Sequence, residues 1–186
     1  MKMKKVNADL IQAARTGDEM KLKALLVDPK CNPMSKDKNG KTALIWAAAR
    51  TQGVCIKMLL PVSDPLAQDE KGMTALMWAA AHSRDSEGVS LLLPVSDACA
   101  CDKRGISTLM LAAAFGNAAH VKILLPVSTV MSQSLDGMTA SAYARVNTYH
   151  KLADFIDAHA LAMSEKSDLC TWTEKCPTQR SGKLRV

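Results

Sequence analysis

Aromatic side chains are scarce in this chain: three Trp, two Tyr and two Phe make up 4% of 186 residues. Apolar residues nevertheless reach 48%, with eleven Met among them and abundant Ala and Leu. Small side chains let helices approach closely, and unbranched ones keep their rotamer freedom in a helix. The composition therefore favours close-packed helices over a sheet and predicts an all-α fold with a sizeable core.

Long apolar runs are also missing. The longest uncharged ones, residues 43–49 and 109–115, are far too short to cross a bilayer core of about 30 Å. The lysines among residues 1–10 precede no apolar run, so we expect neither a secretory signal nor membrane insertion. The six cysteines occupy unrelated positions, which predicts reduced thiols and a cytoplasmic chain.

No strong excess of one charge is present either. The net charge of +6 comes from lysines and arginines spread along the chain, which permits an acidic partner without requiring nucleic acid. A nucleic-acid-associated basic protein remains an alternative because of four basic residues near the C-terminus, but three acidic residues lie among or near them. The basic four are Lys175, Arg180, Lys183 and Arg185, and the acidic three are Glu165, Asp168 and Glu174. Such binding would depend strongly on salt.

What the sequence does have is an internal repeat. Four glycines recur at intervals of 32, 33 and 32 residues: Gly40, Gly72, Gly105 and Gly137. Each follows a polar turn and is itself followed, two residues later, by Thr or Ser. A second marker, Leu-Leu-Pro-Val-Ser, recurs in step around Pro61, Pro94 and Pro126. Two independent markers with one period indicate repeated structural units.

Each repeated residue has a physical role. Glycine tolerates the positive φ of a tight turn. The hydroxyl residues that follow predict helix N-caps: Thr42, Thr74, Ser107 and Thr139. A Leu and paired Ala then predict a narrow first helix, a second apolar helix follows, and proline ends it. The predicted unit is a turn, a short helix, a second helix and a loop.

A period near 33 with the pattern Asp-x-x-Gly-x-Thr-x-Leu-x-x-Ala-Ala resembles the ankyrin repeat. The resemblance implies an all-α solenoid of about five helix-turn-helix units in an ankyrin domain over residues 1–163. The units are expected at about 6–36, 37–68, 69–101, 102–133 and 134–163. The first and last are atypical, as end units must close the core against water. Residues 164–186 are polar and aperiodic, which predicts a flexible tail.

The chain departs from the family pattern Thr-Pro-Leu-His. Ala replaces Pro in two of the units with the full pattern and Thr in another, and Ile45, Met77 and Met110 replace a histidine that would hydrogen-bond the turn. We interpret this as apolar packing in place of polar links between repeats. The variants are similar to those of many bacterial ankyrin proteins, some of which act inside the cell while others are delivered into host cells. Both locations stay open, with the cytoplasm preferred.

The resemblance also implies where function lies. Ankyrin arrays resemble a cupped hand whose turn tips and first helices bind protein partners, so we expect a non-enzymatic protein-binding module, as adaptor, inhibitor or delivered effector. Aromatic and Met anchors with a basic rim are typical of such surfaces. The predicted binding residues are Lys41, Trp46, Arg50, Lys71, Met73, Trp78, His82, Arg104, Ile106, Phe115 and Met138.

Each candidate has a structural alternative. Trp46 and Trp78 occupy a position often filled by a partly buried Leu, so they could belong to the core. The apolar residues after the glycines could shield neighbouring turns from water, and the basic residues could simply be solvated. The charge balance favours an acidic and apolar epitope on the partner, whose identity the sequence does not name; oligomeric state is equally open.

Signals for chemistry are weak by comparison. Gly40, Lys41 and Thr42 resemble the end of a phosphate-binding loop, but Ser35 stands where that loop needs glycine and no strand precedes it. Cys99 and Cys101 are too few for a structural zinc site. No Ser or Cys is paired by its spacing with a His and an acid. We therefore predict no cofactor and no metal, and an enzyme with an unrecognised site remains the weaker alternative.

Overall fold

The computed structural model describes residues 2–82 and 85–166. Ten α-helices and three single-turn 3₁₀ helices make up these ranges, which contain no strand beyond one isolated bridge between Cys101 and Ser107. The α-helices are α1 (Lys2–Thr16), α2 (Glu19–Val27), α3 (Ala43–Ala49), α4 (Gly53–Leu59), α5 (Ala75–His82), α6 (Glu87–Leu92), α7 (Thr108–Ala114), α8 (Ala118–Leu124), α9 (Ala140–Val146) and α10 (His150–Lys166). The predicted all-α fold is confirmed.

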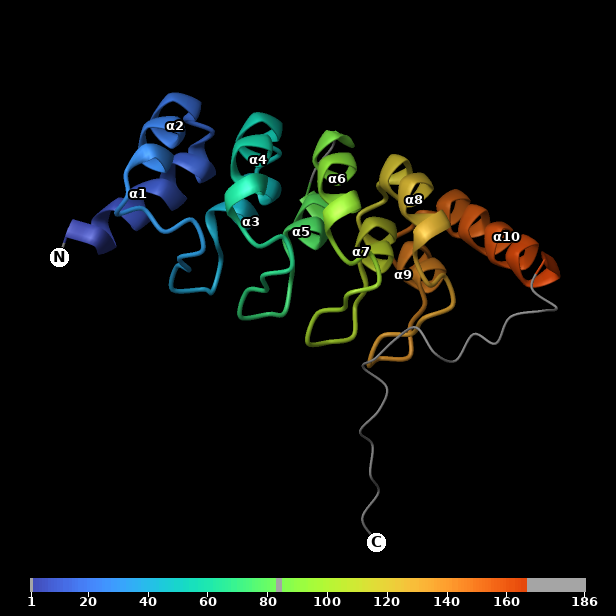
Figure 1. The fold of residues 1–186 in the computed structure, drawn as a ribbon. Helices are drawn as coiled ribbons and strands as arrows, with labels where there is room; N and C mark the ends of the chain where they lie inside the picture. The colour runs from blue at the N-terminus through green and yellow to red at the C-terminus, as the bar shows by residue number, and fades with distance from the viewer. Residues whose placement is uncertain (1, 83–84, 167–186) are drawn as a thin grey trace, which may run out of the picture.

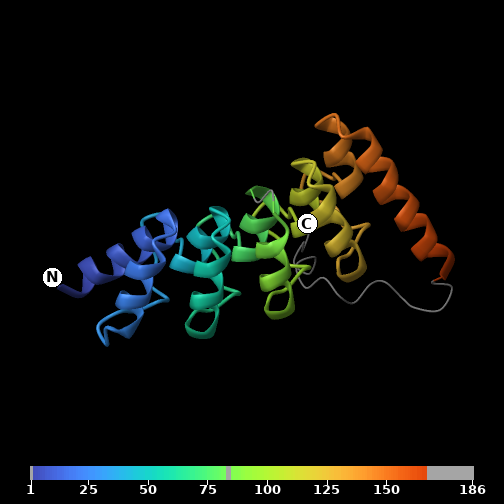
Figure 2. The same cartoon turned by 90° about the horizontal axis from the view of Figure 1, so that it is seen from above.

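The helices form five consecutive pairs stacked side by side in a curved array (Figure 1). The second helix of each pair lies along one side, and the turns that precede α3, α5, α7 and α9 project on the other side (Figures 1 and 2). This is the solenoid that the repeat period predicts. The candidate binding residues are divided between these turns and the first helices. Trp46, Trp78 and His82 lie on first helices, Arg50 and Phe115 cap the ends of first helices, and the other six lie in the turns.

The turns are tied to one another by their backbones. Gly40 and Gly72 have φ of 75° and 82°, the left-handed region that glycine adopts without strain. A Cβ on Gly40 would lie 2.8 Å from the backbone nitrogen of Glu70 in the next turn. That same Glu70 N–H donates to the Asn39 carbonyl oxygen at 3.1 Å, so glycine is needed both for the turn and for the approach of its neighbour.

The hydroxyl residues cap the first helices as predicted. Four side-chain oxygens each accept a hydrogen bond of 3.3 Å from the backbone N–H three residues on: those of Thr42, Thr74, Ser107 and Thr139. Each second helix of the three middle repeats ends two residues before its proline, which lies inside a 3₁₀ turn: Leu60–Val62, Leu93–Val95 and Leu125–Val127. The predicted start of the first helix and the predicted end of the second helix are therefore observed in the middle units.

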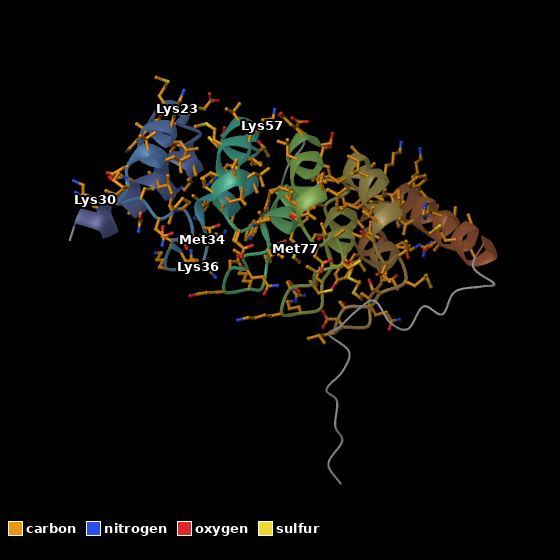
Figure 3. All side chains as sticks on the ribbon, viewed as in Figure 1. Lys23, Lys30, Met34, Lys36, Lys57 and Met77 are labelled. Atoms are coloured by element: carbon orange, nitrogen blue, oxygen red, sulfur yellow. The ribbon has the colours of Figure 1, made fainter. Side chains whose placement is uncertain are left out.

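The core runs unbroken along the array. The first-helix leucines Leu44, Leu76 and Leu109 are fully buried, as are the neighbouring alanine pairs. Two residues that replace the family histidine, Met110 and Met77 (labelled in Figure 3), are also fully buried. Burying such a side chain is worth roughly 1.5–3 kcal/mol. Apolar packing thus stands where the family pattern has a polar link, as the sequence predicts.

Polar side chains close the two ends. Lys21 on α2 is exposed at a position where α4 and α8 bury Cys55 and His120. At the other end, Arg145 of α9 pairs with Asp154 at 3.2 Å and Asp157 at 2.7 Å of α10. Helix α10 continues to Lys166, past the predicted domain limit at residue 163. The remainder of the predicted tail, residues 167–186, lies outside the described residues.

Candidate partner-binding surface

In the second and third repeats, one aspartate accepts hydrogen bonds both from the turn backbone and from a tryptophan of the following helix. Asp37 accepts from the backbone N–H of Lys41 at 2.9 Å through one oxygen and from Trp46 Nε1 at 2.8 Å through the other. Asp69 and Trp78 repeat the contact one unit later at 3.0 Å. Burial raises the pKa of Asp37, but the hydrogen bonds from Trp46 and from the backbone outweigh it and hold that pKa below its usual value. Each indole is therefore held by its edge, which leaves its ring to contact neighbours.

Cations lie over the rings of both tryptophans. The ammonium nitrogen of Lys41 is 3.5 Å from the centroid of Trp78 and 4.4 Å from that of Trp46. The guanidinium carbon of Arg15, on α1, is 5.3 Å from the Trp46 centroid. These distances lie within the range of cation–π attraction. Burial lowers the pKa of Lys41, although the charges of Asp69 and Asp37 act in the opposite direction.

Ring contacts continue into the next two repeats. Trp78 stacks on His82 with centroids 5.0 Å apart and planes inclined by 21°, and His82 meets Phe115 at 5.4 Å and 54°. The pKa of His82 is lowered, first by burial and then by the charges of Lys41 and Arg50. We call this row the cation–aromatic ladder; its members are Arg15, Trp46, Lys41, Trp78, His82 and Phe115. It spans the first four repeats along their first helices.

Residues 10–99 match the family model described as ankyrin repeats in three copies. This chain is an ankyrin-repeat protein. No match was found among curated proteins. Ankyrin repeats generally serve as protein-interaction modules, and the matched range of this ankyrin-repeat protein carries every ladder residue except Phe115.

Two predicted contact residues of the ankyrin-repeat protein are not exposed. Met73 and Ile106 follow the turn glycines, but their exposed fractions are only 7% and 6%. Little of either side chain is open to a partner, because each lies within a turn that is bonded to the adjacent turn. The alternative, that they shield these turns from water, agrees with their burial. Met138, in the last turn, is half-buried.

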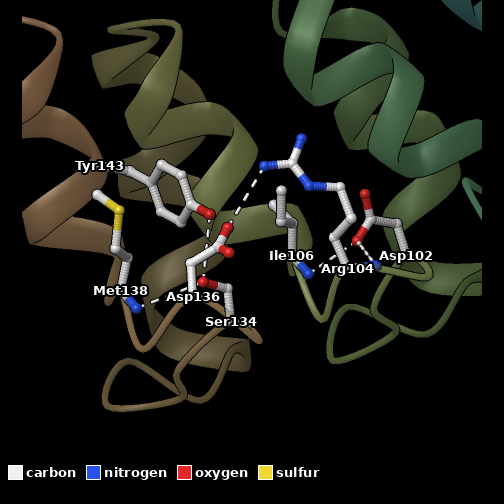
Figure 4. A network of polar contacts seen from close by, with 7 residues as sticks. All are labelled: Asp102, Arg104, Ile106, Ser134, Asp136, Met138 and Tyr143. Carbon is white, nitrogen blue, oxygen red and sulfur yellow. Dashed lines mark hydrogen bonds and ion pairs between the residues drawn. The ribbon is translucent and has the colours of Figure 1, made fainter.

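The remaining predicted residues are basic and exposed. Arg50 caps the C-terminus of α3, and its charge acts on both Lys41 and His82. Lys71 is exposed in the third turn. Arg104, in the fourth turn, pairs with Asp136 of the fifth at 3.5 Å (Figure 4). Arg50 therefore adds charge beside the ladder, whereas Arg104 is engaged with its neighbouring turn.

The fourth repeat lacks the hydrogen bond between the turn and a first-helix ring. Asp102 accepts from the backbone N–H groups of Arg104 at 2.8 Å and Ile106 at 2.9 Å (Figure 4). Leu111, however, occupies the position at which the two earlier repeats have tryptophan. In the fifth repeat a different pair makes the hydrogen bond between ring and turn: the Tyr143 hydroxyl donates to Ser134 Oγ at 3.2 Å. Repeats two, three and five thus tie a first-helix ring to the turn.

A regular spacing in the sequence indicates these hydrogen bonds between ring and turn, although the sequence analysis did not identify it. The acceptor and the ring residue are nine positions apart in all three pairs, 37 with 46, 69 with 78 and 134 with 143. Arg15 was missed as well, because its distance from Trp46 depends on the stacking of α1 against α3 and leaves no pattern in the chain. No local spacing could have identified it.

The described residues also bear on metal binding, membrane insertion and cysteine chemistry. Within the described ranges, no three His, Cys, Asp or Glu residues are grouped so as to hold a metal ion. None of the helices described is long and apolar enough to cross a membrane. The cysteines at 31, 55 and 99 are free thiols, while Cys170 and Cys176 lie outside the described part of the chain.

Proposed function

We propose that this ankyrin-repeat protein binds a protein partner through the cation–aromatic ladder and acts without catalysis, as an adaptor or inhibitor. The observation that supports the proposal is the continuity of the ladder across the first four repeats, with Phe115 49% exposed and Trp46 and Trp78 half-buried. Aromatic and arginine side chains dominate the binding energy of most interfaces. Rings fixed by hydrogen bonds lose little conformational freedom when a partner binds.

The chemistry of the ladder favours an acidic partner segment with apolar side chains. Arg15, Lys41 and Arg50 place three positive charges beside the rings. The carboxylates nearest to Lys41, those of Asp37 and Asp69, are engaged by the turns and by the indoles. A partner carboxylate would gain charge-assisted hydrogen bonds there while apolar side chains cover the rings. Association would slow as salt increases.

The cysteines are the basis for a proposal about the cellular location. Free thiols at Cys31, Cys55 and Cys99 agree with a reducing compartment, so we place the protein in the cytoplasm, with delivery into a host cell as the alternative. In both settings the same surface would act. Partner identification should therefore use lysates of both kinds of cell.

A capture experiment with matched variants tests the proposal. The full chain, the His82→Asp/Phe115→Asp variant and a Val127→Asp control are used as baits, and captured proteins are identified by mass spectrometry. Val127 is 50% exposed, like Phe115, but lies on a 3₁₀ turn outside the ladder. Circular dichroism first establishes that all three baits are folded.

A partner kept by the control and lost with the ladder variant supports the proposal. Its affinity for the wild-type chain is then measured at rising salt, where a decrease indicates an acidic epitope. Identical partner sets for all three baits would show that the ladder is structural only. Capture of nucleic acid instead of protein would favour the basic-protein alternative.

A further inference from the structure

A groove that shares no residue with the ladder lies between α8 and α10. It is an apolar groove of ≈ 630 Å³, lined mainly by Ala118, Lys122, Tyr149, Lys151, Leu152 and Phe155. Tyr149 and Phe155 remain 41% and 42% exposed although both rings face the groove. Two half-exposed rings at one site are unusual for a chain with seven aromatic residues. The groove is separate from the ladder.

The rim of the groove is basic. Lys122 Nζ is 6.0 Å from the centroid of Phe155, and Lys151 is also among the lining residues. No acidic residue lines the groove. The two nearest aspartates on α10, Asp154 and Asp157, pair with Arg145. The groove therefore suits a bulky apolar side chain flanked by carboxylates.

One segment of the chain has this chemistry. Residues 168–174 read Asp-Leu-Cys-Thr-Trp-Thr-Glu, in which Leu169 and Trp172 lie between two acidic residues. We propose that this segment binds back into the groove, with Trp172 against Tyr149 and Phe155 and with Asp168 and Glu174 near the two rim lysines. This inference does not depend on the function proposed for the ladder.

The distances allow this return. From Lys166 to Phe155 the helix measures about 16 Å at 1.5 Å per residue. Six extended residues beyond Lys166 span about 20 Å, which brings Trp172 level with Phe155. The helix surface on the way carries the small exposed residues Ala158 and Ala162, at helical spacing from Phe155. Tethering also gives the segment a millimolar effective concentration at the groove.

Fluorine NMR of the full chain labelled with fluorotryptophan tests the proposal. The chain has three tryptophans, so a Trp172→Phe variant assigns the third resonance directly. A synthetic peptide of residues 167–175 gives the reference shift for an unbound Trp172. We expect the full chain to show Trp172 shifted from this reference, and the Lys122→Glu and Ala118→Asp variants to return it to the reference shift.

Lys23→Glu is the matched control. Lys23 is exposed on the second helix of the first repeat, at the position that Lys122 occupies in the fourth (Figure 3). This variant should leave the Trp172 resonance unchanged, and the Trp46 and Trp78 resonances report whether each variant keeps its fold. The proposal is wrong if wild-type Trp172 already has the peptide's shift, or if the groove variants fail to move it. A Trp172 shift that depends on protein concentration would also overturn it, because the groove would then hold the segment of a second copy.

Discussion

The ammonium group of Lys41 lies 3.5 Å from the ring centroid of Trp78, a residue of the next repeat. In a solenoid each unit contacts only its neighbours, so stability depends on the interfaces between units. Lys41 also lies over Trp46 of its own repeat and therefore joins two units that a proposed partner would bind together. This one side chain links the stability of the array to its candidate binding surface.

Replacing Lys41 with methionine should weaken the interface between the second and third repeats. Methionine keeps most of the aliphatic length but removes the charge, so the cation–π attraction of about 0.5–2 kcal/mol is lost. The free energy of unfolding from urea titration should fall by about 1 kcal/mol after allowance for the partial exposure of the site. Lys38→Met, at an exposed residue of the same turn, is the control and should change little. Equal losses in the two variants would refute the interfacial role of Lys41.

Asp69 should be among the most sensitive polar residues. Only 7% of it is exposed, and it accepts from the backbone of Lys71 and Met73 and from the indole of Trp78. Asp69→Ala leaves these three donors without a partner, which should cost about 2–4 kcal/mol of unfolding free energy. Trp78→Phe removes only the indole donor and a smaller area, and should cost about half as much. Thermal and urea unfolding of the two variants would measure the difference, and a larger loss for Trp78→Phe would contradict the organising role of Asp69.

The lowered pKa of His82 should make stability depend on pH. In the folded chain burial and the charges of Lys41 and Arg50 oppose protonation, whereas the unfolded chain has the ordinary value near 6.5. As the pH falls below that value, the unfolded state binds the proton first. The contribution of His82 to stability is therefore complete above pH 6.5 and is lost as the pH falls toward the folded pKa. Unfolding curves between pH 7.5 and 5 should show this loss, and His82→Gln should reduce it; equal slopes for the two chains would contradict the prediction.

Two glycines with the same backbone conformation should tolerate alanine differently. Gly40 and Gly137 have φ of 75° and 72°, so alanine is strained by about 1–2 kcal/mol at either position. At Gly40 the new Cβ would also meet the Glu70 backbone at 2.8 Å, whereas at Gly137 it would meet nothing within 4 Å. Gly40→Ala should therefore lower the unfolding free energy by at least about 1 kcal/mol more than Gly137→Ala. Equal losses would mean that the turns separate without cost.

The sequence by itself determined the repeating unit. Gly40, Thr42 and Pro61 recur with one period because turn, cap and helix end are local events, governed by backbone dihedrals and by hydrogen bonds within a few residues. The burial of Met77 and Met110 followed from the same register. For that reason the all-α solenoid could be predicted from one sequence.

Which candidate side chains remain exposed to water depends on the packing of the repeats and could not be predicted from the sequence. Met73 and Lys41 occupy equivalent positions after a turn glycine, yet Met73 is buried and Lys41 lies half-exposed between two rings. Arg15 joins the ladder although nothing near it in the sequence indicates this. These outcomes depend on how neighbouring repeats stack, since contacts between units join residues about 32 positions apart. The period predicts that such residues are neighbours, but only the packing of the units decides which of them remain in contact with water.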